Sequence, residues 1–169
     1  MPRNVEIKAR LRDRETVEKI VRSLADHGPE LIVQEDVFFF CENGRLKLRS
    51  FVDGRGELIF YRRRDAAGPA SSDFVKVATD HPVALRELLA AALGISGTVR
   101  KRRTLYLIGQ TRVHLDEVEG LGDWIELEVV LRADQSPDEG ARIADALMSD
   151  LRLRESDLVA EAYVDLLNS

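Results

Sequence analysis

The chain begins with an alternation of polar and apolar residues that predicts a β-strand. Over residues 4–11, NVEIKARL, one face carries Asn4, Glu6, Lys8 and Arg10, and the other face carries four apolar side chains. A period of two residues places successive side chains on opposite faces of a strand. The first strand therefore has one face that is entirely polar and mostly charged.

The same alternation recurs along the chain and is interrupted by helical periodicity. Apolar residues spaced three and four apart predict helices over residues 13–28, 82–93 and 137–151. Residues 66–72 are rich in small residues and predict a connection. The other strands are predicted over residues 31–40, 45–49, 57–63, 73–77, 99–107 and the two halves of 112–131. In residues 31–40 the run Phe38-Phe39-Phe40 interrupts the alternation, so the sequence does not decide which side chains of this strand share a face.

The hairpin over residues 112–131, RVHLDEVEGLGDWIELEVVL, gathers acidic residues on one face. Asp116 shares a face with Arg112 and His114 on the first strand, and Glu126 and Glu128 share a face on the second. Like charges opposite one another destabilise a strand pair, so a cation between them is expected, and a divalent metal is the leading candidate. The alternative is an amphipathic hairpin whose polar face is simply solvated.

These elements predict an α+β fold, an eight-stranded antiparallel β-barrel or tunnel with helices packed outside. The apolar faces need the helices, so the charged faces should meet inside the barrel. A polar interior is costly unless it binds something polar. We see no linker or repeat in the sequence, which predicts a single domain over residues 1–169.

The charged side chains assigned to the interior predict the sign of the ligand. The interior receives a net charge of +4, against −5 for the whole chain, and a basic tunnel within an acidic exterior favours a compact polyanion. The assigned cations are Lys8, Arg10, Arg45, Lys47, Arg49, Arg63, Lys101, Arg103 and Arg112, and the assigned acids are Glu6, Glu57, Asp116, Glu126 and Glu128. The acids fit oxygen ligation of Mg²⁺ or Mn²⁺, which are usually bound together with phosphate oxygens.

Composition narrows the class of protein further. A net charge of −5 argues against a nucleic-acid-binding or membrane-binding surface. The single cysteine, Cys41, excludes an internal disulfide, and the chain shows no signal peptide and no apolar run near the ~20 residues of a membrane span. We expect a cytoplasmic protein. An exposed edge or apolar outer strand could pair two copies as a homodimer.

The ordered motifs resemble the CYTH superfamily, the triphosphate tunnel metalloenzymes. The segment Asn4-Val5-Glu6-Ile7-Lys8 is similar to the family's Glu-x-Glu-x-Lys signature, and the similarity continues to Glu128, covering nearly the whole chain. The other segments that carry the resemblance are RLKLR at 45–49, KRR at 101–103, HLD at 114–116 and LGDWIELE at 121–128. The hairpin most resembles the class IV adenylate cyclase-like branch. The family's fold is an eight-stranded antiparallel tunnel, and its members act on triphosphates with Mg²⁺ or Mn²⁺.

The resemblance assigns roles by position. It implies metal ligation by Glu6, Asp116, Glu126 and Glu128, and catalytic roles for Lys8, Lys101 and Arg103. It implies phosphate contacts by Lys8, Arg45, Lys47, Arg49, Arg63, Lys101, Arg103 and Arg112. Two departures stand out: Asn4 replaces the first glutamate of the signature, and the family's C-terminal basic residue has no counterpart near residues 160–163. An amide oxygen can still ligate a metal but brings no charge.

Three functions follow from this resemblance. The first is a class IV adenylate cyclase-like enzyme that converts ATP to cyclic AMP and pyrophosphate. The second is a triphosphatase acting on tripolyphosphate or thiamine triphosphate and releasing orthophosphate. The third, motivated by Asn4, is a non-catalytic polyphosphate- or nucleotide-binding module. His114 is expected as a base or as a hydrogen-bonding spacer, and Tyr61 and Trp124 as base-stacking or packing residues.

Overall fold

A computed structural model describes residues 2–63 and 68–169 of the chain. Over these residues, eight antiparallel strands close into a barrel in the order β1-β5-β4-β3-β2-β6-β7-β8, so the predicted α+β barrel is confirmed. The strands are β1 (Arg3–Arg10), β2 (His27–Phe39), β3 (Arg45–Phe51), β4 (Gly56–Arg63), β5 (Ala70–Thr79), β6 (Ile95–Ile108), β7 (Thr111–Val118) and β8 (Gly122–Val130). The helices are α1 (Arg14–Leu24), α2 (Pro82–Leu93), α3 (Pro137–Asp150), the 3₁₀ turn η1 (Glu155–Asp157) and α4 (Tyr163–Asn168).

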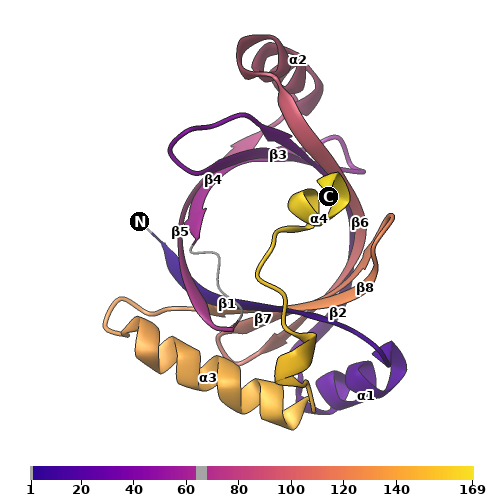
Figure 1. Ribbon diagram of the computed structural model, residues 1–169, viewed down its shortest axis with the longest axis vertical. Coiled ribbons are helices and arrows are strands. Elements are labelled where there is room, and N and C mark those ends of the chain that lie inside the picture. Colours follow the sequence, from indigo (N-terminus) through magenta and orange to yellow (C-terminus); the bar gives the residue numbers. More distant parts are fainter. Residues whose placement is uncertain (1, 64–67) are drawn as a thin grey trace.

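Three helices lie outside the ring of strands. Figure 1 shows α1 and α3 together on one side of the ring and α2 on the opposite side, whereas α4 lies within the ring's outline. α3 contacts β1 and β8, α1 contacts β6, and α2 contacts β2 and β3. In the described part of the chain, no helix is both long and apolar enough to cross a membrane.

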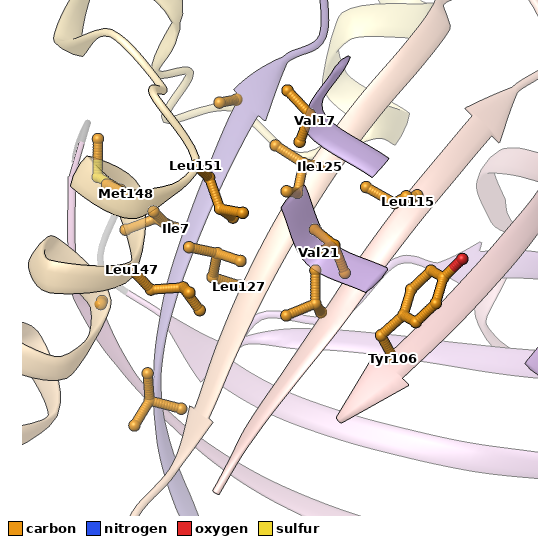
Figure 2. Close-up of a cluster of buried hydrophobic side chains, with 14 of the residues drawn as sticks. Ile7, Val17, Val21, Tyr106, Leu115, Ile125, Leu127, Leu147, Met148 and Leu151 are labelled. Atoms are coloured by element: carbon orange, nitrogen blue, oxygen red, sulfur yellow. The ribbon is translucent and has the colours of Figure 1, made fainter. Parts of the chain in front are cut away.

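The larger apolar cluster fills the space between the barrel wall and the helices α1 and α3. Figure 2 shows Ile7, Ile125 and Leu127 of the wall beside Val21 of α1 and Leu147 of α3. All of these side chains are buried. On this side of the barrel the apolar faces of the strands therefore pack outward onto helices, and the polar faces are left for the inside.

Helix boundaries follow from capping side chains. The Asp13 carboxylate accepts a hydrogen bond from the Thr16 backbone N–H at the start of α1. At α3, the Ser136 hydroxyl accepts from the Glu139 N–H while the Glu139 carboxylate accepts from the Ser136 N–H. These bonds satisfy backbone donors that have no partner inside the helix.

Some boundaries differ from the prediction. Helix α1 ends at Leu24, and β2 begins at His27, so Gly28 and Pro29 belong to the strand rather than to the helix end. Of the predicted connection 66–72, residues 66 and 67 lie outside the described residues, and residues 70–72 already belong to β5. Pairing with β1 extends β5, because Ala70 lies opposite Glu6 and Ser72 opposite Asn4.

Candidate functional site

The barrel encloses a cavity of about 310 Å³ lined by charged side chains from all eight strands. Three of the four predicted metal ligands line it: Glu6, Glu126 and Glu128. The predicted phosphate contacts Lys8, Arg45, Lys47, Arg49, Arg63, Lys101, Arg103 and Arg112 also line it. The structure thus brings residues between positions 6 and 128 of the sequence together around one space.

Strand register explains the placement of the acids. β1 pairs with β8 so that Glu6 lies opposite Glu128 and Lys8 lies opposite Glu126. β7 pairs with β8 on its other side, and there His114 lies opposite Glu126. Residues opposite one another on the same face of a sheet have neighbouring side chains, so this wall of the tunnel carries three carboxylates with basic residues among them.

The surroundings shift the pKa values of Glu6 and Glu126 in opposite directions. Burial, together with the neighbouring charges of Glu128 and Glu126, raises the pKa of Glu6, while Arg63, at 3.4 Å from its carboxylate, acts in the opposite direction. Burial also disfavours the charge on Glu126, but Lys101, His114 and Arg103 outweigh it and hold the pKa of Glu126 well below its ordinary value. A carboxylate whose pKa is raised by its neighbours is one that a bound cation would stabilise.

The oxygen atoms on this wall fit a hard divalent cation. Besides the three glutamates, the buried Asn4 side chain lines the cavity, and its Oδ1 atom has no hydrogen-bond partner. Carboxylate and amide oxygens are the ligands that Mg²⁺ and Mn²⁺ favour. Among the described residues, no three His, Cys, Asp or Glu side chains are already close enough together to hold an ion. These oxygen atoms are therefore of the right chemical type for the cation, but the acidic side chains lie too far apart to hold it in the conformation described.

Asp116 differs from the other predicted metal ligands. Its carboxylate is fully buried and does not line the cavity. Arg103 donates to both carboxylate oxygens at 2.8 Å, and the Tyr163 hydroxyl donates to one of them at 3.1 Å. Lys101 Nζ lies 3.4 Å away. Asp116 thus holds two predicted phosphate contacts in place, and its role as a metal ligand stays a prediction.

Two lysines of the cavity are held at a reduced pKa. Burial and neighbouring cations lower the pKa of Lys47 and of Lys8 to about 8 each, although Asp36 and Glu126 respectively act in the opposite direction. Burial and the charge of Arg103 also lower the pKa of Lys101. Burial is the largest cause in each case, and an anionic ligand beside these lysines would favour their charged form.

Sequence reasoning missed one interior acid, Asp36. Its carboxylate accepts two hydrogen bonds from Arg49, each of 2.8 Å, and lies 3.2 Å from Lys47. Asp36 is 2% exposed and lines the cavity. The signal was present, because three cations in a row over residues 45–49 require an anion on a neighbouring strand. The triple phenylalanine of β2 obscured the facing that would have identified it.

Sequence reasoning also missed Tyr163, at the start of α4. Its ring lies under both Lys8 and Lys101, whose Nζ atoms are 4.4 and 4.9 Å from the ring centroid. Its hydroxyl bonds to Asp116. Tyr163 lies in a helix of only six residues, and so short a segment has no apolar periodicity that would predict where the helix docks.

His114 is buried in the cavity wall, between two of the glutamates. Its Nδ1 lies 3.8 Å from Glu126 and its Nε2 lies 3.9 Å from Glu128, and neither nitrogen makes a hydrogen bond. Burial, followed by the charge of Arg103, lowers the pKa of His114. At neutral pH the ring is therefore uncharged between the two carboxylates. Its expected role as a base or spacer stays a prediction.

Two residues assigned to the interior lie elsewhere. Arg10 is exposed at the end of β1, where its guanidinium stacks over the Trp124 ring at 4.5 Å, and it does not line the cavity. Arg10 still pairs with Trp124 of β8, but at this last residue of β1 its side chain lies beyond the cavity. Glu57 lies at one mouth of the tunnel, 3.5 Å from Lys76. Trp124 is fully buried and packs edge-on against Tyr163.

The model of the CYTH domain family matches residues 2–163, so the chain belongs to this family. The motifs of the sequence predicted a closed antiparallel tunnel lined by cations and acids, and the structure has this arrangement. The family's triphosphate tunnel and its general use of divalent metals agree with the site. The search among curated proteins found no match.

Solved structures share the fold over nearly the whole chain. The PH1012 protein from Pyrococcus horikoshii is 24% identical, with a TM-score of 0.84 over 96% of this chain and 98% of that chain. A Vibrio parahaemolyticus protein described as a candidate adenylate cyclase is 16% identical, with a TM-score of 0.80 over 98% of both chains. HpAC1 from Hippeastrum, described as having a dominant triphosphatase activity, is 16% identical, with a TM-score of 0.64 over 97% of this chain and 93% of that chain. At these identities the likeness is one of fold.

Proposed function

We propose that the protein is a metal-dependent enzyme that binds a linear triphosphate along the tunnel and cleaves one of its phosphoanhydride bonds. The observation that carries the proposal is the meeting of nine cationic side chains, the eight predicted phosphate contacts and Lys76, in one cavity with a wall of carboxylates. Gathering so many charges inside a barrel is costly even when part of them are paired, because each must be removed from water. A triphosphate with a divalent cation would give both kinds of charge a further partner.

The side chains of the chain divide the work. Arg45, Lys47 and Arg49 on β3 would neutralise the phosphate chain from one side, and Arg112 and Arg63 from others. Lys8, Lys101 and Arg103, the proposed catalytic cations, would stabilise the charge that develops on the leaving phosphate. Asp116 would keep Arg103 aimed into the cavity through its two hydrogen bonds. Fixed donors of this kind need no reorganisation during the reaction.

Glu6, Glu126 and Glu128 are the proposed ligands of Mg²⁺ or Mn²⁺, and the ion would polarise a phosphoryl oxygen and neutralise the charge that develops. Asn4 would contribute its amide oxygen without a charge. We therefore expect weaker ion binding than a glutamate at this position would give, and replacing Asn4 by glutamate should tighten it.

Two reactions remain open to this site, and a different observation favours each. The hairpin over residues 112–131 resembles the class IV adenylate cyclase-like branch, which favours attack of a ribose hydroxyl on the α-phosphorus of ATP. The cavity of about 310 Å³ lies at the low end of small-molecule sites. It favours a substrate whose phosphate chain alone is enclosed, as in hydrolysis of tripolyphosphate or thiamine triphosphate. The dominant triphosphatase activity described for HpAC1 points the same way.

Phosphorus NMR of reactions with ATP and with tripolyphosphate, each with Mg²⁺ and with Mn²⁺, separates these reactions. Cyclic AMP and pyrophosphate from ATP would identify the cyclase, and orthophosphate from tripolyphosphate would identify the triphosphatase. Tight binding without turnover under every condition would identify the binding module instead. Turnover gained by Asn4→Glu would then trace the loss of activity to Asn4.

A further inference from the structure

Two groups of three charged side chains in the barrel wall have the same composition and the same arrangement. Each has a lysine and an arginine two residues apart on one strand, and an aspartate directly opposite the arginine on the neighbouring strand. We call them the Asp36 clamp and the Asp116 clamp. The first consists of Asp36 on β2 with Lys47 and Arg49 on β3, and the second of Asp116 on β7 with Lys101 and Arg103 on β6.

The contacts inside the two clamps are also the same. In each clamp the arginine donates from Nε to one aspartate oxygen and from Nη2 to the other, and all four distances are 2.8 Å. The lysine Nζ lies 3.2 Å from the carboxylate of Asp36 and 3.4 Å from that of Asp116. Both aspartates are buried. Each carboxylate therefore fixes one edge of its guanidinium, in direction as well as in charge.

The two clamps have the same orientation in the barrel. The strands that carry them are neighbours in the order β3-β2-β6-β7, and each neighbouring pair is antiparallel. β3 and β6 therefore run in the same direction, and so do β2 and β7. All four basic side chains line the cavity, but only the two arginines also line a hollow of about 500 Å³ at the mouth where Glu57 lies. The second clamp thus repeats the first around the barrel.

The free edge of each guanidinium is available to a ligand. In the part of the chain that the structure describes, Nη1 of Arg49 and Nη1 of Arg103 make no hydrogen bond, whereas Nε and Nη2 are held by the aspartates. Each clamp contains two cations and one acid, so one positive charge is left for an anion. A guanidinium that is already held in place loses little conformational freedom when a phosphate oxygen binds to it.

We infer that Asp36 is a positioning residue, which holds Arg49 in place to bind one phosphoryl group of the substrate just as Asp116 holds Arg103 to bind another. The inference rests on the proposed binding of a triphosphate. An acid that served only to neutralise cations would act equally well from any nearby position. The same pair of 2.8 Å bonds in both clamps fixes where each arginine lies, which is what recognition of a phosphate requires.

The test is a set of double-mutant cycles on the binding of tripolyphosphate with Mg²⁺, measured by calorimetry. Asp36→Glu keeps the negative charge but moves the carboxylate by one methylene group, and it should weaken binding by about tenfold. In an Arg49→Lys background the same change should have little further effect, because lysine has no planar fork to position. In an Arg103→Lys background the full loss should remain. The loss caused by Asp116→Glu should behave in the opposite way and disappear only in the Arg103→Lys background.

The control is Glu35→Asp, which shifts a carboxylate by the same amount on the same strand. Glu35 pairs with Arg100 at 2.8 Å away from the cavity, so the variant should bind tripolyphosphate as the wild-type protein does. Circular dichroism and urea unfolding of every variant ensure that folded proteins are compared.

The outcomes separate this inference from the proposed function. If Asp36→Glu bound tripolyphosphate as tightly as the wild-type protein, Asp36 would only balance charge and the inference would be wrong. A loss of the same size in both arginine backgrounds would show a merely structural role and would also overturn it. Either result leaves the proposed function intact, whereas absence of tripolyphosphate binding to the wild-type protein would overturn both.

Discussion

At the scale of single residues, a few buried acids neutralise the positive charge of the cations inside the tunnel. Asp36 is the clearest example, because burial opposes its ionisation, yet Arg49 and Lys47 outweigh burial and hold its pKa well below the ordinary value. The side chains of Arg49 and Lys47 are only 14% and 15% exposed. Removing the carboxylate would leave two cations without their partner.

We predict that Asp36→Asn lowers the free energy of unfolding by about 3 kcal/mol, since breaking a buried ion pair leaves an uncompensated charge. Urea denaturation followed by circular dichroism measures the loss. Tripolyphosphate should restore part of it, because the anion takes the place of the missing carboxylate beside Arg49. A loss below about 1 kcal/mol would show that Asp36 is not needed to neutralise these cations.

The lowered pKa of Lys47 predicts how binding depends on pH. With a pKa of about 8 the side chain is charged at pH 7 and largely neutral at pH 9 in the free protein. A bound polyanion restores the charge, so binding near pH 8.5 should take up protons, and the affinity for tripolyphosphate should fall between pH 7 and pH 9. Titrations in buffers of different ionisation enthalpy measure the uptake.

The control for this prediction is Lys47→Arg, which keeps a permanent charge. It should reduce the uptake without abolishing it, because Lys8 shares the lowered pKa. Equal uptake by the wild-type protein and the variant would contradict the role given to Lys47.

At the scale of elements, the barrel depends on helices packed tightly against its outer wall. In α3, a Cβ atom on Gly140 would come within 2.6 Å of Leu131 and 2.7 Å of Val5 of β1. The glycine therefore sets how closely the helix approaches the strand. An extra methyl group must displace the helix or the side chains beneath it.

We predict that Gly140→Ala destabilises the protein by about 1–3 kcal/mol through overpacking, despite the better helix propensity of alanine. Thermal or urea unfolding measures the difference. Ser149→Ala, at an exposed position of the same helix, should change stability by less than about 0.5 kcal/mol. A Gly140→Ala variant as stable as the wild-type protein would show that α3 can move away freely.

The sequence predicts the elements well where periodicity is long. The alternation over residues 4–11 and the charged faces of residues 45–49 and 99–107 appear in the structure as strands of the barrel. The boundary between α1 and β2 was wrong, because Gly28-Pro29 was interpreted as a helix end. A last segment over residues 158–167 was expected to contribute Leu158, Tyr163, Leu166 and Leu167, but neither α4 nor its place of docking was predicted, since a helix of six residues shows too short a pattern.

At the scale of the whole molecule, the site could be predicted where the alternation alone decides the facing. All eight predicted phosphate contacts line the cavity for this reason. Asp36 and Tyr163 could not be found in this way. Their placement depends on which distant strands are neighbours, such as β2 beside β6, and on a segment that returns to the tunnel from the far end of the chain.

The whole molecule should gain stability from its ligand. A ligand that binds only the folded state stabilises it by about 2.7 kcal/mol at a free concentration 100 times its dissociation constant. Tripolyphosphate with Mg²⁺ should therefore raise the melting temperature, and orthophosphate at the same concentration should raise it much less. An equal rise with both anions would indicate general salt effects instead of a tunnel site.

The central claim is that one interior cavity binds a triphosphate, and calorimetric titration of tripolyphosphate with Mg²⁺ tests it most directly. The wild-type protein should bind one equivalent, and Lys47→Gln, which removes an interior charge, should weaken binding by at least about tenfold. Lys19→Gln, which removes an exposed charge paired with Glu15 on α1, should leave binding unchanged. Equal weakening by both variants, or no saturable binding to the wild-type protein, would contradict the account.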